Sequence, residues 1–528
     1  MLTPQVAARP DAPAIIDRYR GAARTLSFAE LDHQSKQGAA FLRRCGLRRG
    51  DGVLLFQPMS AELYVVLLAI FRLGLVAIVM DPSGGLTAIE RCCAAFPPKA
   101  FFGGPKAHLL RLISRAIRKI PVQIVVAAGM PGATPWRRAR EMRACEDIEA
   151  CAPDLPALVT FTGGGTGAPK AACRTHAFLL AQYRALLDVL DVSPGEVDLT
   201  TLPIVALANL ASGVTSLIPD ADLRAPGSID PGPVLDQIDA HRATRTSASP
   251  ALLERLADHC LAHGRTIPRF DKVLTGGGPV FPDVLDKIRR VAPNADPAAI
   301  YGSTEAEPIA RVAASAISDD DRQAMRRGGG LLAGRPVPAV TVRILPDQTG
   351  SSIGRLSRER FEKACLPPGE PGEIVVSGAH VLTGYLHGRG DQETKFRVDD
   401  VCWHRTGDAG CLDPSGRLWL LGRCEAKVSD ARGVLYPFAV EAAARQHHNV
   451  LRVALTADRD GRRVLAMQLR EPRDPGTDVR IVRESLAWAG VDSFRVYHRL
   501  PVDLRHNAKI DYRALGRLLD RQPMAAAD

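Results

Sequence analysis

A run of glycines ahead of a lysine is the stretch of this sequence that points most clearly to chemistry. In FTGGGTGAPK, residues 161–170, three glycines precede Thr166, and a proline separates the loop from Lys170. Glycines let backbone N–H groups approach a phosphate closely, and a lysine ammonium group neutralises its charge. The stretch therefore predicts a phosphate-binding loop, with a solvent-exposed glycine turn as the alternative.

Two common phosphate loops fit this stretch less well. A Walker A loop needs Gly before the Lys and Ser or Thr after it, whereas Pro169 and Ala171 occupy those positions. A G-x-G-x-x-A dinucleotide fingerprint can start at Gly163, but it needs a helix to open at the glycines. The proline and the extended AAC that follows indicate the return arm of a hairpin instead. We expect a hairpin in which Thr166 donates its hydroxyl and Lys170 neutralises charge.

Five further segments place glycines or polar side chains where predicted strands end. They are KVLTGGGPV, AIYGSTEAEPIA, HRTGDAG, GRCEAKV and LPVDLRHNAKIDY, and they contain Gly276 to Gly278, Tyr301, Thr304, Glu305, Asp408, Arg423 and Lys509. Ligands of open α/β sheets bind at the carboxyl ends of strands, and the Asp408 carboxylate could accept two hydrogen bonds from a ribose diol. Each charged residue taken alone is more typical of a solvated surface position. The information lies in the order of the segments.

The composition is that of a globular protein with more than one domain. A chain of 528 residues is too long for one compact core, and 46% hydrophobic with 24% charged residues is ordinary for such proteins. The 68 Lys and Arg against 58 Asp and Glu give a net charge of +10, but no basic tract interleaved with aromatic residues is present. We therefore expect no nucleic-acid partner, and an anionic substrate fits the charge better.

Cysteine usage and the apolar segments both favour a cytoplasmic location. The eleven cysteines form no C-x-x-C pair, which favours reduced thiols over disulfides or a zinc site. The N-terminus lacks a signal-peptide pattern. The longest apolar stretch, Leu63 to Met80, is interrupted by Arg72 and Gly74 and predicts a buried helix followed by a strand, with no transmembrane span. Peripheral contact with a membrane or a multi-enzyme assembly stays open.

The apolar patterns predict a large α/β domain, residues 1–422, and a small mobile α+β lid, residues 423–528. Runs such as GVLLFQP, LVAIVM, VQIVVAAG and ALVTFTG alternate with helical segments up to about Gly334, which is typical of parallel sheets covered on both faces. VTVRIL, GEIVVSG and RLWLLG then predict a smaller antiparallel sheet. In the lid we expect a helix around residues 437–446 and the strands RVALTAD and RVLAMQL. Catalysis is expected in the cleft between body and lid.

The order of the segments resembles the acyl-adenylate-forming superfamily of acyl-CoA synthetases, luciferases and peptide-synthetase adenylation domains. A phosphate hairpin, a glycine-rich strand end, Y-G-x-T-E, T-G-D, G-R and a late lysine follow one another as in that family. The resemblance runs from Thr25, in TLSFAELD, to Ala514 and so covers nearly the whole chain. It implies the family's α/β fold: a large ATP- and acyl-binding N-terminal domain with parallel-rich sheets and a small β-barrel-like subdomain, followed by a mobile lid.

The resemblance also implies a role for each matching residue. Thr166 and Lys170 would grip the phosphates, Glu305 would hold Mg²⁺, and Lys509 would be the adenylation lysine carried by the lid. Glu425 stands where the family keeps its charged hinge residue. Gly276, Gly277 and Gly278, with Tyr301, would line the adenine, Thr304 would meet the α-phosphate, and Asp408 with Arg423 would take the ribose. The other residues expected to bind ATP are Thr162, Gly163, Gly164, Gly165 and Gly167 of the phosphate loop, and Gly302.

The sequence departs from the family pattern at a few positions. Hydroxyl residues usually occupy the places of Gly163 and Gly165, so Thr166 would carry more of the hydrogen bonding. Ala206 stands where many members have a gate histidine at the acyl channel. Further departures and matches are Ala508 before the catalytic lysine, Arg432 where the lid loop generally has glycine, and Glu441 at the position of the lid-helix acid.

The amino-acid sequences of four stretches most resemble those of the β-lactone synthetases of bacterial long-chain olefin biosynthesis. These are TLPIVALANLASGVTSLIPD, TGGGPVFP, YGSTEAEPIA and VDLRHNAKI. The similarity implies ATP- and Mg²⁺-dependent adenylation of a 2-alkyl-3-hydroxy fatty acid, followed by closure of a β-lactone, with enzymes of the same hydrocarbon pathway as partners. The alternatives are a long-chain acyl-CoA synthetase, which would add CoA as cosubstrate, and a non-catalytic nucleotide-binding assembly subunit. His176 and His506 are candidate bases for the hydroxyl, although we expect a structural role for each.

Overall fold

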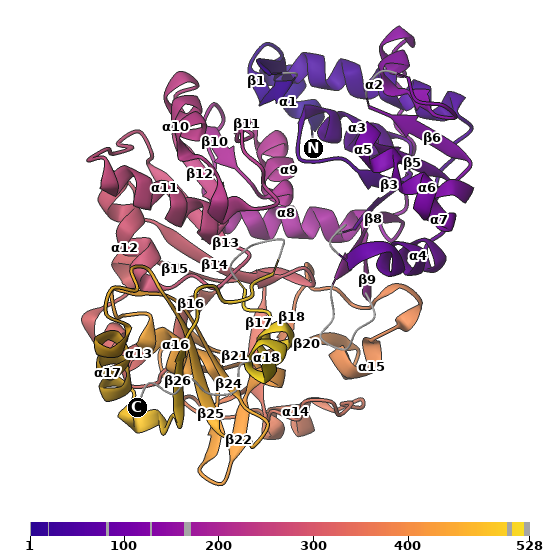
Figure 1. Cartoon of the computed structure of the whole chain (residues 1–528). Coiled ribbons are helices and arrows are strands. Elements are labelled where there is room, and N and C mark those ends of the chain that lie inside the picture. Colours follow the sequence, from indigo (N-terminus) through magenta and orange to yellow (C-terminus); the bar gives the residue numbers. More distant parts are fainter. Residues whose placement is uncertain are drawn as a thin grey trace. The chain divides into compact units, whose positions relative to one another are not determined.

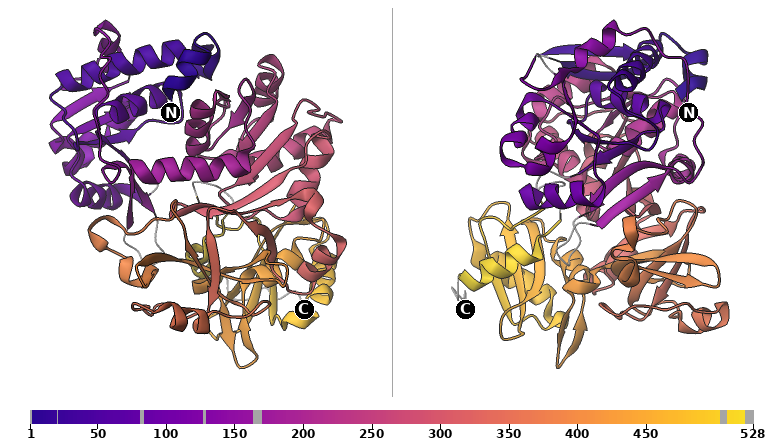
Figure 2. Two further views of the ribbon diagram at one scale, coloured as in Figure 1. Left: turned by 180° about the vertical axis from the view of Figure 1, so that it is seen from behind. Right: turned by 90° about the vertical axis from the view of Figure 1, so that its right-hand side faces the viewer.

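The computed structural model describes residues 2–19, 21–80, 84–126, 129–162, 170–503 and 509–521 (Figures 1 and 2). The chain forms two compact units. The first comprises Met1–Leu223, Asp230–Ala248 and Leu382–Asp391, and the second comprises Arg224–Ile229, Ser249–Val381 and Gln392–Asp528. The division into residues 1–422 and 423–528 remains a prediction.

The first unit contains a largely parallel sheet in the strand order β7-β6-β5-β3-β4-β8-β9. Every neighbouring pair is parallel except the last, in which β9 returns antiparallel to β8. The strands are β3 (Gly52–Phe56), β4 (Val76–Val79), β5 (Ala100–Gly103), β6 (Val122–Val125), β7 (Thr134–Pro135), β8 (Pro156–Thr162) and β9 (Lys170–Thr175). The antiparallel β8–β9 pair confirms the return arm expected after the glycine loop.

Both faces of this sheet are buried because successive side chains of its apolar strands point to opposite sides. Leu55 and Phe102 pack into the core beneath α2 and α3, whereas Leu54 and Phe101 pack into the core beneath α4 and α7. This explains why the strands read as continuous apolar runs. The covering helices are α2 (Phe28–Arg44), α3 (Ala61–Arg72), α4 (Gly85–Ala95) and α7 (Arg115–Lys119).

A second sheet of the first unit follows the order β12-β10-β11-β1-β2. The neighbouring strands β12 and β10, β10 and β11, and β11 and β1 are parallel, and β2 is antiparallel to β1. The buried Arg245 guanidinium donates to Glu196 at 2.8 Å and to the carbonyl of Leu190 at 2.6 Å. The elements are β12 (Arg245–Ala248), β10 (Val197–Thr200), β11 (Thr215–Leu217), β1 (Pro13–Tyr19) and β2 (Ala22–Ser27), with α8 (His176–Leu190), α9 (Pro203–Ser212) and α10 (Pro231–Ala240).

The second unit begins with parallel strands and continues antiparallel. β13 and β14 are parallel, and the antiparallel pairs β14–β15, β15–β16, β16–β21, β21–β20, β20–β18 and β18–β17 follow, with β19 beside β20. The predicted antiparallel strands after Gly334 are present, but antiparallel pairing already begins with β15, before that residue. The strands are β13 (Lys272–Gly276), β14 (Ala298–Ser303), β15 (Ala306–Ala313), β16 (Leu331–Pro336), β17 (Thr341–Leu345), β18 (Gly372–Ser377), β19 (Lys395–Val398), β20 (Val401–Leu412) and β21 (Leu418–Arg423).

The C-terminal part of the second unit has its own α+β architecture, coloured orange to yellow in Figure 2. β24 and β25 are antiparallel, β26 is parallel to β25, and apolar cores lie on both sides of these strands. The predicted helix and two strands are present. The elements are β22 (Val428–Asp430), β23 (Gly433–Leu435), α16 (Pro437–Ala444), β24 (Val450–Ala457), β25 (Arg463–Leu469), α17 (Pro475–Ser485), β26 (Ser493–Val496) and α18 (Tyr512–Arg521).

Ion pairs fasten this C-terminal segment to α11 (Pro250–Ala262) and α12 (Pro282–Val291). The Arg445 guanidinium, at the end of α16, lies 2.8 Å from Asp283, and Arg470 lies 2.9 Å from Glu254. Burial would raise the pKa of Glu254, but Arg445 and the neighbouring cations lower it to about 2. Breaking such a buried cluster by removing one partner leaves an uncompensated charge, which is strongly destabilising.

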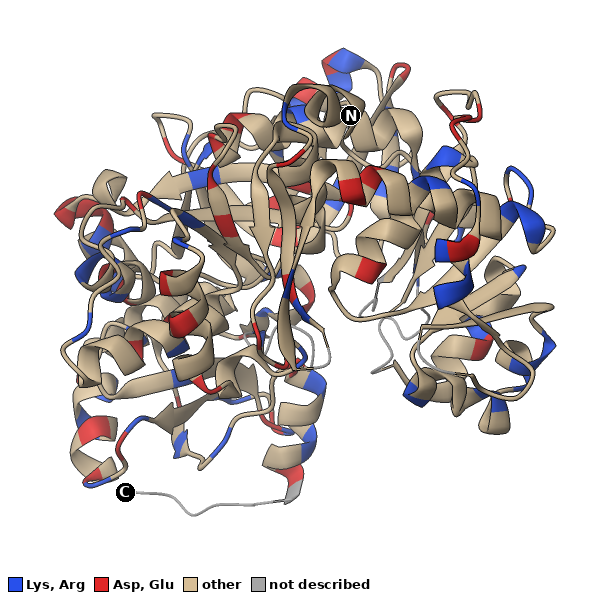
Figure 3. Cartoon of the chain, turned by 90° about the horizontal axis from the view of Figure 1, so that it is seen from above, with Lys and Arg blue, Asp and Glu red and all other residues tan. Residues whose placement is uncertain are grey.

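Three broader expectations also meet the structure. All eleven cysteines are free thiols, and the apolar stretch from Leu63 to Met80 forms α3 and then β4 as predicted. No helix in the described part of the chain is long and apolar enough to cross a membrane. Figure 3 shows Lys and Arg dispersed over the ribbon among Asp and Glu.

The buried Glu441 carboxylate makes the C-terminal segment sensitive to pH. It is 2% exposed on α16 and accepts hydrogen bonds from the backbone N–H of Leu455 at 3.0 Å and from the Tyr512 hydroxyl at 2.7 Å. Burial raises the pKa of Glu441 from 4.5 to about 7, although both hydrogen bonds act in the opposite direction. The folded state therefore binds this proton more tightly than the unfolded chain.

We predict that Glu441→Gln removes this pH dependence. The stabilising effect of the protonated carboxyl is complete below pH 4.5 and is lost by roughly 3 kcal/mol as the pH rises to about 7. The variant keeps an oxygen acceptor and no longer titrates, so the hydrogen-exchange protection factors of the β24 amides, Leu455 included, should stay constant across that range. Glu484→Gln, on the exposed face of α17, is the matched control. A variant whose protection factors fall in parallel with those of the wild type would contradict the prediction.

Candidate active site

The second unit brings three of the predicted site residues into one hydrogen-bonded cluster. The Tyr301 hydroxyl on β14 donates to one Asp408 oxygen at 2.7 Å, and the Arg423 guanidinium on β21 donates to the other at 3.0 Å. Burial, together with the Asp408 charge, raises the pKa of the Tyr301 phenol well above its ordinary value, so the phenol remains a donor. The Asp408 charge likewise raises the pKa of Arg423.

Strand register and one glycine explain how Asp408 and Arg423 meet. They lie directly opposite each other in the antiparallel β20–β21 pair. Gly407, at φ +69°, has Arg423 so close that a Cβ atom would lie 3.0 Å from its Nη2. The Arg423 guanidinium also donates to the Thr406 carbonyl at 3.1 Å. In the T-G-D sequence, Thr406 therefore supplies a carbonyl acceptor, Gly407 leaves room for the Arg423 guanidinium, and Asp408 supplies the carboxylate.

A buried ion pair fixes the strand that carries Asp408. The Arg405 guanidinium on β20 donates twice to Glu373 on β18, at 2.8 and 2.5 Å, and both side chains are at most 5% exposed. Thr406 accepts a hydrogen bond from the Asp408 backbone N–H and donates to the carbonyl of Ile374. Sequence reasoning missed this support, because Arg405 and Glu373 lie in different segments and only their strand pairing brings them together.

The glycine-rich segment after β13 lies beside β14. Gly276 is opposite Ile300, and a Cβ atom at Gly276 would lie 2.8 Å from the Ile300 carbonyl oxygen. Gly277 has φ +84°, a conformation that favours glycine, and Gly278 follows. Gly302, one residue after Tyr301, is equally confined, because its Cβ would lie 3.0 Å from the carbonyl oxygen of Ala306. These positions need glycine for backbone packing, which is compatible with a flat ligand lying against them.

Thr304 and Glu305 form the turn between β14 and β15, and their side chains are half-buried. The Glu305 backbone N–H donates to the Ser303 hydroxyl at 3.3 Å. Within the described ranges, no group of three or more His, Cys, Asp and Glu side chains could hold a metal ion. A magnesium ion that arrives with nucleotide phosphates needs only one or two carboxylates from the protein, and Glu305 fits that requirement.

The first unit contributes Lys170, the first residue of β9. Its partner in the β8–β9 register is Thr162, and its ammonium group lies 5.6 Å from the centre of the Tyr385 ring. Gly390, at φ +96°, lets the lysine stem pass close, since a Cβ there would be 2.7 Å from the Lys170 Cε. Tyr385 and Gly390 were not predicted from the sequence. The predicted residues Gly163, Gly164, Gly165, Thr166 and Gly167 lie outside the described residues, as do His506 and Ala508.

The two remaining predicted residues lie in the C-terminal part of the second unit. Lys509 is exposed; its backbone N–H donates to the Asp503 carboxylate at 2.9 Å, and its carbonyl accepts from the Asp503 N–H at 2.8 Å. Glu425 is exposed in the short 3-10 helix Cys424–Ala426, directly after Arg423. The expected hinge residue therefore follows the Asp408 cluster along the chain.

Comparison with known proteins identifies the family. The model of the AMP-binding enzyme family matches residues 2–386, which is well over half of the chain. The chain belongs to the AMP-binding enzyme family. A relative from Xanthomonas campestris pv. campestris, named olefin beta-lactone synthetase, is 34% identical over 92% of this chain and 89% of its own length. A relative of the same name from Stenotrophomonas maltophilia is 33% identical over 92% of this chain and 90% of its own length. A 4-coumarate–CoA ligase from Oryza sativa subsp. japonica is 25% identical over 85% of this chain and 78% of its own length.

Solved structures agree on the fold of this AMP-binding enzyme. An amide bond synthetase from Marinactinospora thermotolerans aligns with a TM-score of 0.76 at 22% identity, over 94% of this chain and 95% of that one. An O-succinylbenzoate coenzyme A synthetase from Bacillus subtilis, in complex with AMP, aligns with a TM-score of 0.75 at 22% identity, over 96% of both chains. The expected acyl-adenylate-forming fold is confirmed. The protein is an acyl-adenylate-forming ligase that uses ATP.

We predict that Asp408→Asn weakens ATP binding. The amide keeps the shape of the side chain but removes the charge that Tyr301 and Arg423 hold in place. A hydrogen bond to a charged group contributes about 1.5–3 kcal/mol, so the KM for ATP should rise roughly 10- to 100-fold. The measurement is acid-dependent pyrophosphate release, with Asp400→Asn, at an exposed carboxylate before β20, as the control. An unchanged KM in Asp408→Asn would show that this carboxylate does not bind the nucleotide.

Proposed function

We propose that this ligase adenylates a 2-alkyl-3-hydroxy fatty acid and closes it to a β-lactone, releasing pyrophosphate and AMP. Two relatives named olefin beta-lactone synthetase, which align over 92% of the chain, are the observation that carries this proposal. The apolar helix α9 supports a fatty substrate: Ala206 is fully buried, and Leu207 and Leu210 belong to the same core. An alkyl chain would suit such surroundings better than a polar side chain.

In the first step, an oxygen of the substrate carboxylate attacks the α-phosphorus of ATP. The new bond joins that oxygen to phosphorus, and the bond to the pyrophosphate oxygen breaks. Asp408 would hold the ribose hydroxyls, and Gly276 to Gly278, with Tyr301, would receive the adenine. Because this step chiefly redistributes charge over phosphate oxygens, positioning and positive charge supply most of the catalysis.

Cations of the protein would stabilise the developing charge. Lys170 would bind the pyrophosphate side together with Thr166, Thr304 would contact the α-phosphate, and Lys509 would approach the same oxygens from the C-terminal segment. Glu305 would hold Mg²⁺, which neutralises phosphate charge when it is bound with ATP. In water these ammonium groups would act weakly, whereas a closed site strengthens each interaction.

In the second step, the 3-hydroxyl oxygen of the same substrate attacks the acyl carbon. A carbon–oxygen bond forms within the molecule, AMP leaves with the electron pair of the anhydride bond, and the hydroxyl proton passes to solvent. The reacting groups belong to one molecule, so proximity offsets much of the strain of a four-membered ring. No thiol acceptor is needed.

A dedicated base is not required by this scheme. His176 begins α8 in the first unit, its ring contacts Phe71, and burial lowers the pKa of its imidazole. A residue placed in this way packs against its neighbours and supports the structure. His176→Phe should therefore affect folding before it affects lactone closure.

The decisive test is a product assay with Mg-ATP and a long-chain 2-alkyl-3-hydroxy acid, with and without CoA. We expect β-lactone and AMP without CoA, detected by NMR and mass spectrometry. Lys509→Ala should lower pyrophosphate release by roughly 100-fold or more, because one preorganised charge is lost. Arg513→Ala, at a neighbouring exposed position on α18, is the control.

Each other product contradicts the proposal in a definable way. A thioester that appears only with CoA would identify an acyl-CoA synthetase. Absence of pyrophosphate release over a broad panel of acids would indicate a nucleotide-binding assembly subunit. Unchanged pyrophosphate release in Lys509→Ala would remove the lysine from the adenylation step.

A further inference from the structure

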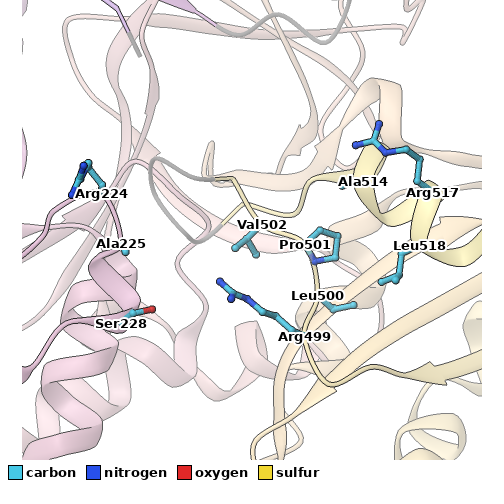
Figure 4. A pocket seen from close by; sticks show the side chains of 10 residues that line it. All are labelled: Arg224, Ala225, Ser228, Arg499, Leu500, Pro501, Val502, Ala514, Arg517 and Leu518. Atoms are coloured by element: carbon cyan, nitrogen blue, oxygen red, sulfur yellow. The ribbon is translucent and has the colours of Figure 1, made fainter. Parts of the chain in front are cut away.

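A pocket of about 550 Å³ lies in the second unit between the short segment 224–229 and the C-terminal part (Figure 4). One wall comes from the turn that includes the 3-10 helix Pro226–Ser228, and the other comes from the stretch after β26 and from α18. The lining residues are Arg224, Ala225, Ser228, Arg499, Leu500, Pro501, Val502, Ala514, Arg517 and Leu518. The size is within the range of pockets that hold small molecules.

The charge of this pocket is positive. Three of its ten lining residues are arginines and none is acidic. Arg499 and Arg517 are exposed at the mouth of the pocket and form no ion pair within the described ranges. Burial lowers the pKa of nearby Arg452, and the charge of Arg499 is among those that lower it further. An anion placed here would relieve repulsion and gain charge-assisted hydrogen bonds.

The remainder of the lining is apolar. Leu500 is fully buried and forms part of a core with Leu515, Leu519 and the neighbouring strands, so it supports the pocket wall from behind. Figure 4 shows Pro501 and Val502 beside it, with Leu518 on the facing side of α18. Methylene groups of a ligand are stabilised when they are buried on such a surface. A small inorganic anion would leave this surface unused.

We propose that the pocket binds an amphipathic anion: an alkyl chain that ends in a carboxylate or a phosphate. The head group would interact with Arg499, which Figure 4 shows directed into the space between the two walls, and Arg517 would add positive charge at the rim. The chain would lie on Pro501, Val502 and Leu518. This site differs from the Asp408 cluster, in which the carboxylate is already paired with Arg423 and Tyr301. Binding here does not depend on lactone formation, so the two proposals can fail separately.

The position of the pocket links it to the segment that carries Lys509. Val502 in the pocket wall pairs with Ile510 in a β-bridge. The Asp503 backbone N–H donates to the Lys509 carbonyl, and the Asp503 carboxylate accepts from the Lys509 N–H. A ligand that contacts Val502 would therefore rest on the same structure that holds the lysine. A ligand in this pocket would therefore act first on the position of the C-terminal segment that carries Lys509.

The test is calorimetric titration of the full-length protein with dodecyl phosphate and, separately, dodecanoate, both below their micellar concentrations. We expect binding to the wild type, and loss or weakening by roughly 10-fold or more of that binding in the double variant Arg499→Gln/Arg517→Gln. Arg513→Gln, one helical turn before Arg517 on α18 and outside the pocket, should bind as the wild type does. Tighter binding of dodecanoate would indicate a fatty acid as the natural ligand, and tighter binding of the phosphate would indicate a phospholipid or a phosphorylated lipid.

Two results would overturn the proposal. One is equal affinity of the wild type and the double variant for both probes, measured in variants whose AMP affinity is unchanged and which are therefore folded. The other is binding of neutral dodecyl maltoside as tight as that of the charged probes. If the double variant does not fold, Leu518→Glu replaces it, because a carboxylate beside the arginines should weaken both anionic probes by a similar factor.

Discussion

The hydrogen bonds that Asp408 accepts from Tyr301 and Arg423 connect strands that are far apart in the sequence. Tyr301 lies at the end of the parallel part of the second unit, and Arg423 lies where the antiparallel sheet ends. One carboxylate thus joins the segment that would receive adenine to the segment that leads into the expected hinge. A nucleotide bound there would contact both parts of the unit at once.

The structure around this carboxylate is built to keep it in place. The buried Arg405–Glu373 pair fixes β20 against β18, and the hydroxyl of Thr406 fixes the backbone on either side of Gly407. Beyond Arg423, ion pairs between Arg445 and the carboxylates of α11 and α12 hold the C-terminal segment against its own unit. The part of the site expected to bind ribose is therefore held by buried contacts, and the lysine-bearing segment is attached to the same unit through the ion pairs of Arg445.

Local sequence patterns predicted the elements well and the contacts between them poorly. Apolar runs bounded by turn residues predicted β3, α3, β4, β13 and β25. Pro169 predicted that a hairpin arm, and not a helix, follows the glycine loop, and β9 is that arm. The family pattern then placed Asp408 and Arg423, which the structure pairs across β20 and β21.

Contacts that depend on distant pairing were not accessible to that reasoning. Tyr385 beside Lys170 and the arginine-lined pocket come from segments more than two hundred residues apart, and their meeting is decided by the packing of whole sheets. A lone tyrosine or arginine carries no periodic signal of its own. Such residues become recognisable as part of a site only when the fold has brought their partners to them.

The most direct test of the role given to Asp408 is equilibrium binding of AMP and 2′-deoxy-AMP to the wild-type protein. If the carboxylate receives the ribose hydroxyls, loss of one hydroxyl should weaken binding by roughly 10-fold or more, since a half-buried charged acceptor is left with one partner fewer. Equal affinity for the two nucleotides would contradict the account, because the cluster of Tyr301, Asp408 and Arg423 would then stabilise the fold without recognising ribose.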